Sequence, residues 1–185
     1  MLKHNKLRDL CEKVYTESDG EVSNIEYLIS GSVVTFRGTD EFKDWITNAR
    51  ILPWWHRGIG WCPAGFVKTA EDLSVEILCR MVEKDIAGSE LTLTGHSLGG
   101  AMALLVGAVM TNRGLSPAEI VTFGAPKCGR LKLLDNLNVT CYRNGKDIVP
   151  TVPTIMRRHK KNVQVGTAKS RIKDHYITNY EIPEE

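Results

Sequence analysis

The sequence lacks the features of disulfide-rich, zinc-binding and polyanion-binding proteins. Its 185 residues include five cysteines, an odd number without C-x-x-C or Cys/His spacing, which favours isolated thiols in a reducing compartment. Lys and Arg number 24 against 22 Asp and Glu, so the net charge of +2 gives no strong field for steering nucleic acid. We therefore expect no metal site and no nucleic-acid partner.

Long apolar runs and a secretion signal are also missing. The longest nearly apolar run, residues 99–110, has about 12 residues and is too short to cross a bilayer. The first residues, MLKHNKLRDLCEK, mix charged with apolar side chains and lack the apolar segment of a signal peptide. We therefore expect a soluble cytoplasmic protein without a transmembrane segment, and release by cell lysis stays open.

What is present is an alternation of predicted strands and helices, without repeats or linkers. The predicted elements, in order, are a helix at 2–16, a hairpin of strands at 23–30 and 33–38, helical turns at 40–48, an irregular stretch at 49–65, an amphipathic helix at 66–87, a strand at 90–95, a helix at 98–112, a strand at 118–124, a short helix at 132–137, a strand at 139–145, an edge strand at 162–166 and a terminal helix or turn at 175–182. This order predicts one compact domain over residues 1–185, an α/β sandwich with a mostly parallel central sheet.

The stretch LTLTGHSLGG crowds three glycines around Ser97, between a predicted strand and a predicted helix. In a G-x-S-x-G turn, glycines flank the serine because side chains there would collide with backbone, and Gly95 and Gly99 occupy these positions. We expect Gly100 to let the following helix pack close to the sheet. The motif predicts Ser97 as a nucleophile and the N–H of Leu98 as an oxyanion-hole donor, whereas the alternative is a tight turn with an idle serine.

A nucleophilic serine needs a histidine as its base, and five histidines are candidates. His4 is expected to be solvated on a polar helix, and His56 lies in a tryptophan-rich stretch. His96 is expected to point to the opposite side of the turn and to pack there. His159 and His175 both follow the serine, as the base does in α/β-hydrolases. Neighbouring cations and the lack of a nearby carboxylate disfavour His159, so His175 is the predicted base.

Asp147 is the predicted acid that orients this base. It follows a predicted strand and lies on a loop stiffened by two prolines. Asp174 adjoins His175, but a residue rarely folds back onto the ring of its immediate neighbour. Asp135 lies in a predicted helix. The alternative for Asp147 is an ordinary surface or turn carboxylate.

Six motifs in fixed order resemble the class 3 lipases, the α/β-hydrolase family of fungal triacylglycerol lipases and their small bacterial and phage relatives. They are VVTFRGTDEFKDWITN, AGF, LTGHSLGGAMALL, VTFGAPKCG, YRNGKDIVPTVP and DHYITNY, and together they extend over most of the chain. The resemblance implies an α/β-hydrolase three-layer sandwich with Ser97, Asp147 and His175 as the catalytic triad. It also implies that Thr39, after the RG pair, supplies the second oxyanion-hole group.

The resemblance further implies a lipase or esterase that cleaves carboxylic esters of acylglycerols or related lipids through an acyl-enzyme, with no metal or cofactor. A phospholipase or acyltransferase on the same residues, or a catalytically silent lipid-binding module, remains an alternative. Asn48, Pro63 and Thr151 stand where relatives often carry aspartate, histidine and histidine. These departures touch supporting residues and leave the substrate open.

All four tryptophans lie within 17 residues, at Trp45, Trp54, Trp55 and Trp61. Residues 45–62 are therefore a candidate lid or active-site loop, with Trp54 and Trp55 against substrate or a lipid–water boundary. The alternative is that the indoles pack a long loop onto the core, as expected for Trp45.

Overall fold

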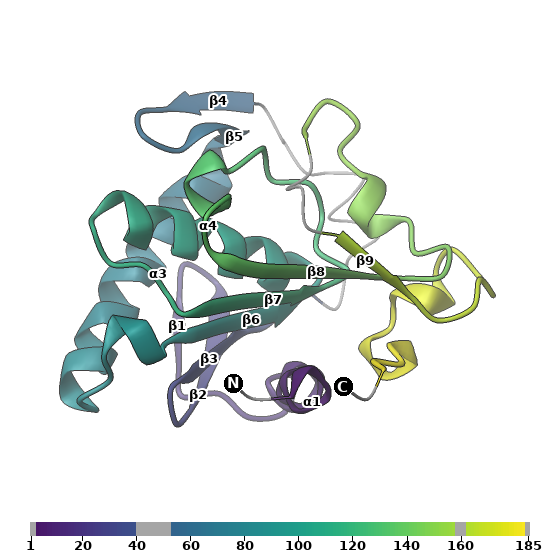
Figure 1. Cartoon of the computed structure of the whole chain (residues 1–185), viewed down its shortest axis with the longest axis horizontal. Helices are drawn as coiled ribbons and strands as arrows, with labels where there is room; N and C mark the ends of the chain where they lie inside the picture. Colours follow the sequence, from purple (N-terminus) through teal and green to yellow (C-terminus); the bar gives the residue numbers. More distant parts are fainter. Residues whose placement is uncertain (1–2, 40–52, 158–161, 184–185) are drawn as a thin grey trace.

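The computed structural model describes residues 3–39, 53–157 and 162–183 (Figure 1). The predicted helical turns at 40–48, with Trp45 and Asn48, lie outside the described residues, and so does His159. No described helix is both long enough and apolar enough to cross a membrane.

A seven-stranded sheet runs through the protein in the order β1-β2-β3-β6-β7-β8-β9. Its strands are β1 (Gly20–Val22), β2 (Ile25–Ser30), β3 (Val33–Phe36), β6 (Thr92–His96), β7 (Glu119–Phe123), β8 (Asn138–Asn144) and β9 (Asn162–Val165). The strands from β3 to β9 are parallel, whereas β1, β2 and β3 pair antiparallel. The predicted α/β class with a mostly parallel sheet is therefore confirmed, as is the hairpin that begins it.

Helices cover both faces of this sheet. The α3 helix (Ala64–Glu83) and the α4 helix (Leu98–Asn112) lie on one face, and α1 (His4–Lys13) lies on the other with the C-terminal turns (Figure 1). Strand residues alternate between the two layers, since Ile120 packs in the α3/α4 core and Val121 packs in the α1 core.

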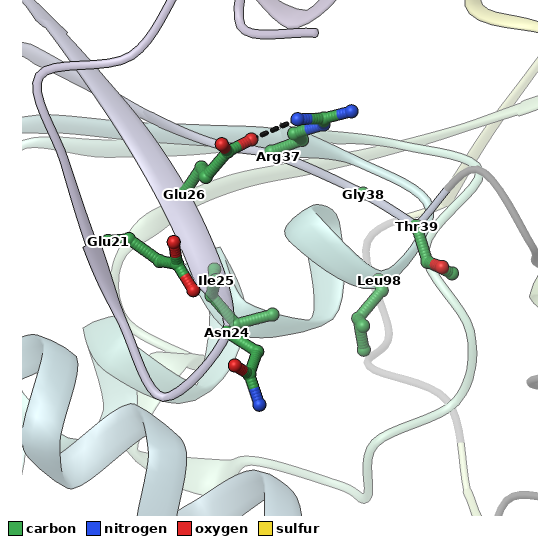
Figure 2. Close-up of a pocket in the computed structure, with 8 residues that line it drawn as sticks. All are labelled: Glu21, Asn24, Ile25, Glu26, Arg37, Gly38, Thr39 and Leu98. Atoms are coloured by element: carbon green, nitrogen blue, oxygen red, sulfur yellow. Dashed lines mark hydrogen bonds and ion pairs between the residues drawn. The ribbon is translucent and has the colours of Figure 1, made fainter.

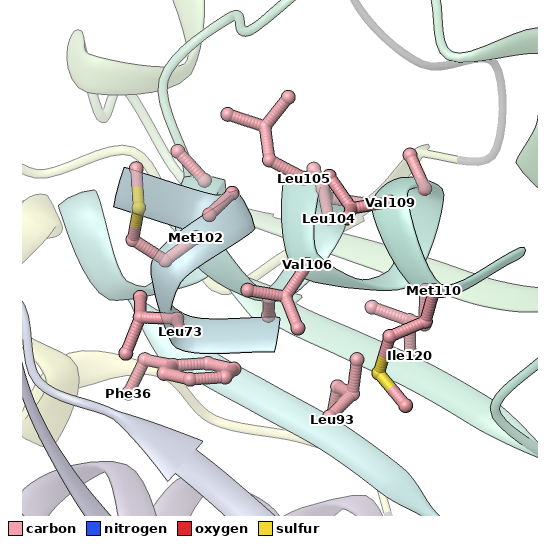
Figure 3. Close-up of a cluster of buried hydrophobic side chains, with 14 of the residues drawn as sticks. Phe36, Leu73, Leu93, Met102, Leu104, Leu105, Val106, Val109, Met110 and Ile120 are labelled. Carbon is pink, nitrogen blue, oxygen red and sulfur yellow. The ribbon is translucent and has the colours of Figure 1, made fainter. Parts of the chain in front are cut away.

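The α4 helix lies between the sheet and α3, which explains why it is apolar all round. Its residues 99–110 are all buried. Figure 3 shows Leu93 and Ile120 of the sheet packed against side chains of α4 such as Val106 and Met110. Each such side chain stabilises the fold by about 1.5–3 kcal/mol when fully buried. The burial of α4 therefore holds the first residues of this helix in place.

One prediction is wrong in the stretch expected to be irregular. It contains a separate two-stranded sheet of β4 (Pro53–His56) and β5 (Gly60–Pro63). These strands pair antiparallel, with Trp55 opposite Trp61. Neither PWWH nor GWCP alternates apolar with polar residues, so the sequence carries no period of two to signal them.

Shorter elements also differ from their predictions. The amphipathic helix ends at Glu83 rather than 87, because Asp85 adopts a positive φ of 54° that a right-handed helix cannot continue. The predicted helix at 132–137 is only a 3₁₀ turn, Lys132–Leu134, and the C-terminal segment forms two further 3₁₀ turns, Lys173–His175 and Ile177–Asn179. The three-residue β1 is too short to have been recognised.

The prediction that His4 is solvated is wrong. It shares one face of α1 with Leu7 and Cys11, and that face packs on the sheet. Its Nδ1 lies 2.8 Å from Tyr142 Oη and its Nε2 lies 3.1 Å from Glu119 Oε1. The prediction was wrong because α1 is polar in composition, although the face that carries His4 is buried.

Candidate active site

The structure brings the three predicted catalytic residues together at the carboxyl edge of the parallel strands. Ser97 directly follows β6, Asp147 follows β8, and His175 lies in a turn after β9. Ligands of open α/β sheets bind at this edge, where loops from neighbouring strands meet.

Ser97 lies on a strained turn between β6 and α4. Its φ is 55° and its ψ is −125°, a conformation that is rare for a residue with a side chain. A Cβ on Gly99 would overlap the carbonyl oxygen of Phe36, and one on Gly95 would overlap the carbonyl group of Gly99. A Cβ on Gly100 would come within 2.9 Å of Ala125 Cβ. The glycines therefore allow the close approach that this turn requires.

A continuous hydrogen-bond chain joins the three side chains. His175 Nδ1 lies 2.9 Å from Asp147 Oδ2, and His175 Nε2 lies 3.0 Å from Ser97 Oγ. Because a carboxylate only accepts, Nδ1 carries the proton and Nε2 is left to accept from the serine hydroxyl. All three side chains are buried, and Val149 N donates to the other carboxylate oxygen of Asp147 over 2.9 Å.

Two residues that received no role from the sequence complete the surroundings of Asp147. Tyr180 Oη donates to Asp147 Oδ2 over 2.6 Å, and burial followed by the charge of Asp147 raises the pKa of Tyr180, so it keeps its proton. Gly124 has a φ of 61°, and a Cβ there would lie 2.7 Å from Tyr180 Oη and 2.9 Å from Asp147 Oδ2. Both lie within quoted motifs, VTFGAPKCG and DHYITNY, which was the available signal.

His96 packs as predicted but not on the opposite side of the turn. Its ring lies 4.7 Å from the ring of His175, centroid to centroid, because the C-terminal turns cover the same face of β6. Its Nε2 donates to the backbone carbonyl of His175 over 2.7 Å, and Tyr15 Oη donates to its Nδ1 over 3.0 Å. Burial, and then the proximity of His175, lowers the pKa of His96 to about 3, so its ring is neutral.

A pocket of about 260 Å³ adjoins the serine turn, and Thr39 and Leu98 line it (Figure 2). The segment after β3 passes close by, since a Cβ on Gly38 would come 3.2 Å from Ser97 Cβ. The N–H of Leu98, the first residue of α4, has no acceptor within its own helix. Thr39 and Leu98 therefore line one pocket from two different elements, and their role as oxyanion-hole donors stays a prediction.

The model of the class 3 lipases, "Lipase (class 3)", matches residues 33–157, which is well over half of the chain. This chain belongs to the class 3 lipase family. It is 24% identical over 159 residues to a secreted mono- and diacylglycerol lipase A of Penicillium cyclopium, covering 80% of this chain and 50% of the relative. It is 32% identical over 133 residues to the chloroplastic phospholipase A1 PLIP1 of Arabidopsis thaliana, covering 62% of this chain and 20% of that protein.

Solved lipase structures share its fold. The nonglycosylated LIP2 lipase of Yarrowia lipolytica superimposes with a TM-score of 0.64 at 19% identity, over 86% of this chain and 77% of that one. The chain spans about half the length of the Penicillium relative, so the fold and family are shared over a part of such proteins.

The other two candidate acids of this class 3 lipase fold, Asp174 and Asp135, interact with groups other than the ring of His175. Asp174 accepts backbone N–H groups from Lys146 at 2.8 Å, Ser170 at 3.0 Å and Lys169 at 3.1 Å. Burial raises its pKa, but these donors outweigh that effect, and the pKa lies below its ordinary value. Asp135 forms an ion pair with an arginine instead of meeting a histidine.

The tryptophans of the candidate lid are on the surface of this lipase-family protein. Trp54 and Trp55 lie on β4 and are 63% and 58% exposed, so packing onto the core does not describe them. Neither is among the described residues that line the pocket beside Ser97. Their contact with substrate therefore stays a prediction.

Proposed function

We propose that this chain hydrolyses carboxylic esters of acylglycerols or related lipids through a covalent acyl-enzyme. The observation that carries the proposal is the hydrogen-bonded chain from Asp147 through His175 to Ser97, with the serine on a strained strand-to-helix turn. The names of the relatives, mono- and diacylglycerol lipase and phospholipase A1, support a lipid ester as the substrate.

In the first half of the proposed reaction, Ser97 Oγ attacks the ester carbonyl carbon while His175 Nε2 takes the hydroxyl proton. The carbonyl oxygen becomes an oxyanion that the backbone N–H groups of Leu98 and Thr39 stabilise, each donor contributing roughly 3 kcal/mol. His175 then gives its proton to the leaving alcohol oxygen as the ester C–O bond breaks, and an acyl group remains on Ser97.

In the second half, His175 takes a proton from water as the water oxygen attacks the acyl carbonyl. The bond to Ser97 breaks, the serine recovers its proton from His175, and the carboxylic acid leaves. Asp147 holds the imidazole in the Nδ1–H tautomer and stabilises the imidazolium that forms in both halves. No cofactor enters the balance of these steps.

A fluorophosphonate probe, which reacts with activated serines, tests the proposal. The wild-type protein should be labelled, and Ser97→Ala should not. Ser89→Ala, which alters an exposed serine at the opposite end of β6 from Ser97, should be labelled like wild type. An unlabelled wild type would contradict the hydrolase proposal. Liposome binding by that protein, unchanged in Ser97→Ala, would then favour the lipid-binding module.

A phospholipase is the second candidate, because a relative that is 32% identical over 133 residues is a phospholipase A1. Incubation with diacylglycerol and phosphatidylcholine, each with and without glycerol as an acyl acceptor, distinguishes the possibilities. The proposal expects free fatty acid from diacylglycerol. Faster release from phosphatidylcholine would identify a phospholipase. Monoacylglycerol formed from phosphatidylcholine and added glycerol would identify an acyltransferase.

A further inference from the structure

The β4–β5 hairpin exposes three tryptophans to solvent. Three indoles on one hairpin form a large exposed aromatic surface. Trp54, Trp55 and Trp61 are 63%, 58% and 59% exposed. Trp55 and Trp61 are cross-strand partners whose rings meet edge to face, with centroids 5.8 Å apart. Clustered exposed indoles of this kind mark a surface that binds something partly apolar.

A hollow of about 800 Å³ opens under this hairpin. The described residues that line it come from the hairpin and from two segments that follow the site strands, and they are Pro53, Trp55, Gly58, Ile59, Gly60, Trp61, Gly129, Arg130, Lys132, Ile155, Met156 and Arg157. Three of them are cations and none is acidic. The hairpin lies across the sheet from α1 and both termini (Figure 1).

The three cations differ in how much of their charge is neutralised. Arg130 is 3.7 Å from a carboxylate oxygen of Asp135. Lys132 and Arg157 are exposed, and no carboxylate within the described part of the chain forms an ion pair with either. Because the whole chain has a net charge of only +2, this hollow concentrates positive charge that the protein does not carry generally.

This combination of side chains selects one kind of partner. A neutral oil surface would match the indoles and leave the cations without counter-charges, and a small soluble anion would match the cations and leave the indoles exposed. An anionic phospholipid bilayer offers both, since indole rings lie at the headgroup level and lysine and arginine contact lipid phosphates.

We propose that the hollow and the exposed tryptophans of β4–β5 form a docking surface for anionic phospholipid bilayers. Trp54, Trp55 and Trp61 enter the headgroup region while Lys132 and Arg157 contact its phosphates. The two segments that line the hollow opposite the hairpin, at 129–132 and 155–157, follow Gly124 and Asp147 closely in the chain, so docking brings the bilayer near the candidate active site. The inference concerns binding and not ester cleavage, and it can fail or succeed independently of the proposed hydrolysis.

The first test uses full-length Ser97→Ala protein, so that no lipid is consumed. Cosedimentation is measured with vesicles of phosphatidylcholine alone and of phosphatidylcholine mixed with phosphatidylglycerol. Each cation close to an anionic surface strengthens binding about fivefold, so the mixed vesicles should bind at least about tenfold more protein. Binding should weaken with salt and shift tryptophan emission to shorter wavelength. Equal binding to both vesicle types would overturn the proposal.

The second test reverses charge within and outside the hollow, in the same Ser97→Ala background. Lys132→Glu with Arg157→Glu should abolish the preference for anionic vesicles, a loss of roughly tenfold or more. Lys3→Glu with Lys84→Glu changes the net charge equally at exposed positions elsewhere and should keep that preference within about twofold. An equal loss in both double variants would overturn the proposal.

The third test separates a bilayer from a soluble phosphate. Trp55→Ala with Trp61→Ala should reduce the emission shift, because only Trp54 of the three inserting indoles remains, and should weaken binding to anionic vesicles by about tenfold. Glycerol 3-phosphate should not displace the Ser97→Ala protein from these vesicles. Full displacement would assign the cations to a free phosphate ester and overturn the bilayer proposal.

Discussion

The protein buries two histidines that each hold a carboxylate at one ring nitrogen and a hydroxyl at the other. At the carboxyl edge of the sheet, His175 lies between Asp147 and Ser97 at 2.9 and 3.0 Å. Under α1, His4 lies between Glu119 and Tyr142 at 3.1 and 2.8 Å. Distances and residue types alone do not show which of the two arrangements is the candidate catalytic site.

The two arrangements differ in what surrounds the hydroxyl group. The hydroxyl of Ser97 belongs to a residue with a strained backbone beside a helix N-terminus, and its neighbour Leu98 lines a pocket. The hydroxyl of Tyr142 belongs to a ring stacked on Phe123 in the α1 core. A carboxylate, a histidine and a hydroxyl in line therefore suffice to hold two elements together. Chemistry also needs a presented nucleophile and room for its substrate.

Replacing the two histidines should have very different effects on catalysis. His175→Ala should lower the rate of p-nitrophenyl butyrate hydrolysis by about 10⁴-fold or more, because Ser97 loses its base. His4→Ala should change that rate less than about threefold at temperatures where the protein stays folded. His159→Ala should likewise leave turnover intact, and a severe loss there instead of at His175 would overturn the assignment of the base.

A pH-dependent effect on stability is expected from His96, whose ring packs against His175 without belonging to the triad. The pKa of His96 is about 3 when folded and about 6.5 when unfolded, so only the unfolded state takes up this proton as the pH falls from about 6.5 to about 3. Wild type should lose on the order of 4 kcal/mol of unfolding free energy across this window through His96.

His96→Gln, which keeps an N–H donor without titrating, should lack this loss. Urea unfolding of both proteins at several pH values measures it. The difference between their unfolding free energies should change steadily below pH about 6.5, and a constant difference would contradict the buried neutral ring.

A smaller effect is expected on stability under α1. Glu119→Gln replaces the carboxylate that accepts from His4 and from Asn138 Nδ2, at 3.1 and 2.8 Å. The expected loss is about 1–3 kcal/mol of unfolding free energy, seen as an earlier urea midpoint with unchanged slope. Turnover measured well below the thermal midpoint should match wild type, and lost turnover in the folded variant would assign this cluster a functional role.

The smallest effect compares the two tyrosines. Tyr180→Phe deletes one of the donors to Asp147, and kcat/KM should fall by about tenfold, as expected for a hydrogen bond to a charged group. Tyr142→Phe deletes the hydroxyl beside His4 and should leave kcat/KM within about twofold. Equal effects on kcat/KM would show that Tyr180 only supports packing.

The sequence predicted the parts of the site that short stretches encode. The turn around Ser97 is visible because its glycines and flanking elements are contiguous, and Asp147 and His175 follow from chain order. Tyr180 and Gly124 were not assigned, because their contacts with Asp147 exist only after β7, β8 and the C-terminal turns have assembled.

The fold was predicted where periodicity was strong and missed where it was weak. The helices around Leu73 and Val106 and the parallel strands show clear apolar patterns, whereas β4 and β5 do not. The burial of His4 could not be predicted from α1 alone, because its two hydrogen-bond partners lie 115 and 138 residues further along the chain.

The burial of α4 on all sides determines how this helix responds to heating. Amides of a helix buried on all sides exchange with solvent only when the whole domain opens. Ser97 is fixed to the first turn of that helix, so its geometry survives local fluctuations of exposed elements such as β4–β5. The position of Ser97 is therefore as stable as the fold itself, and heat should displace this side chain only when the domain unfolds.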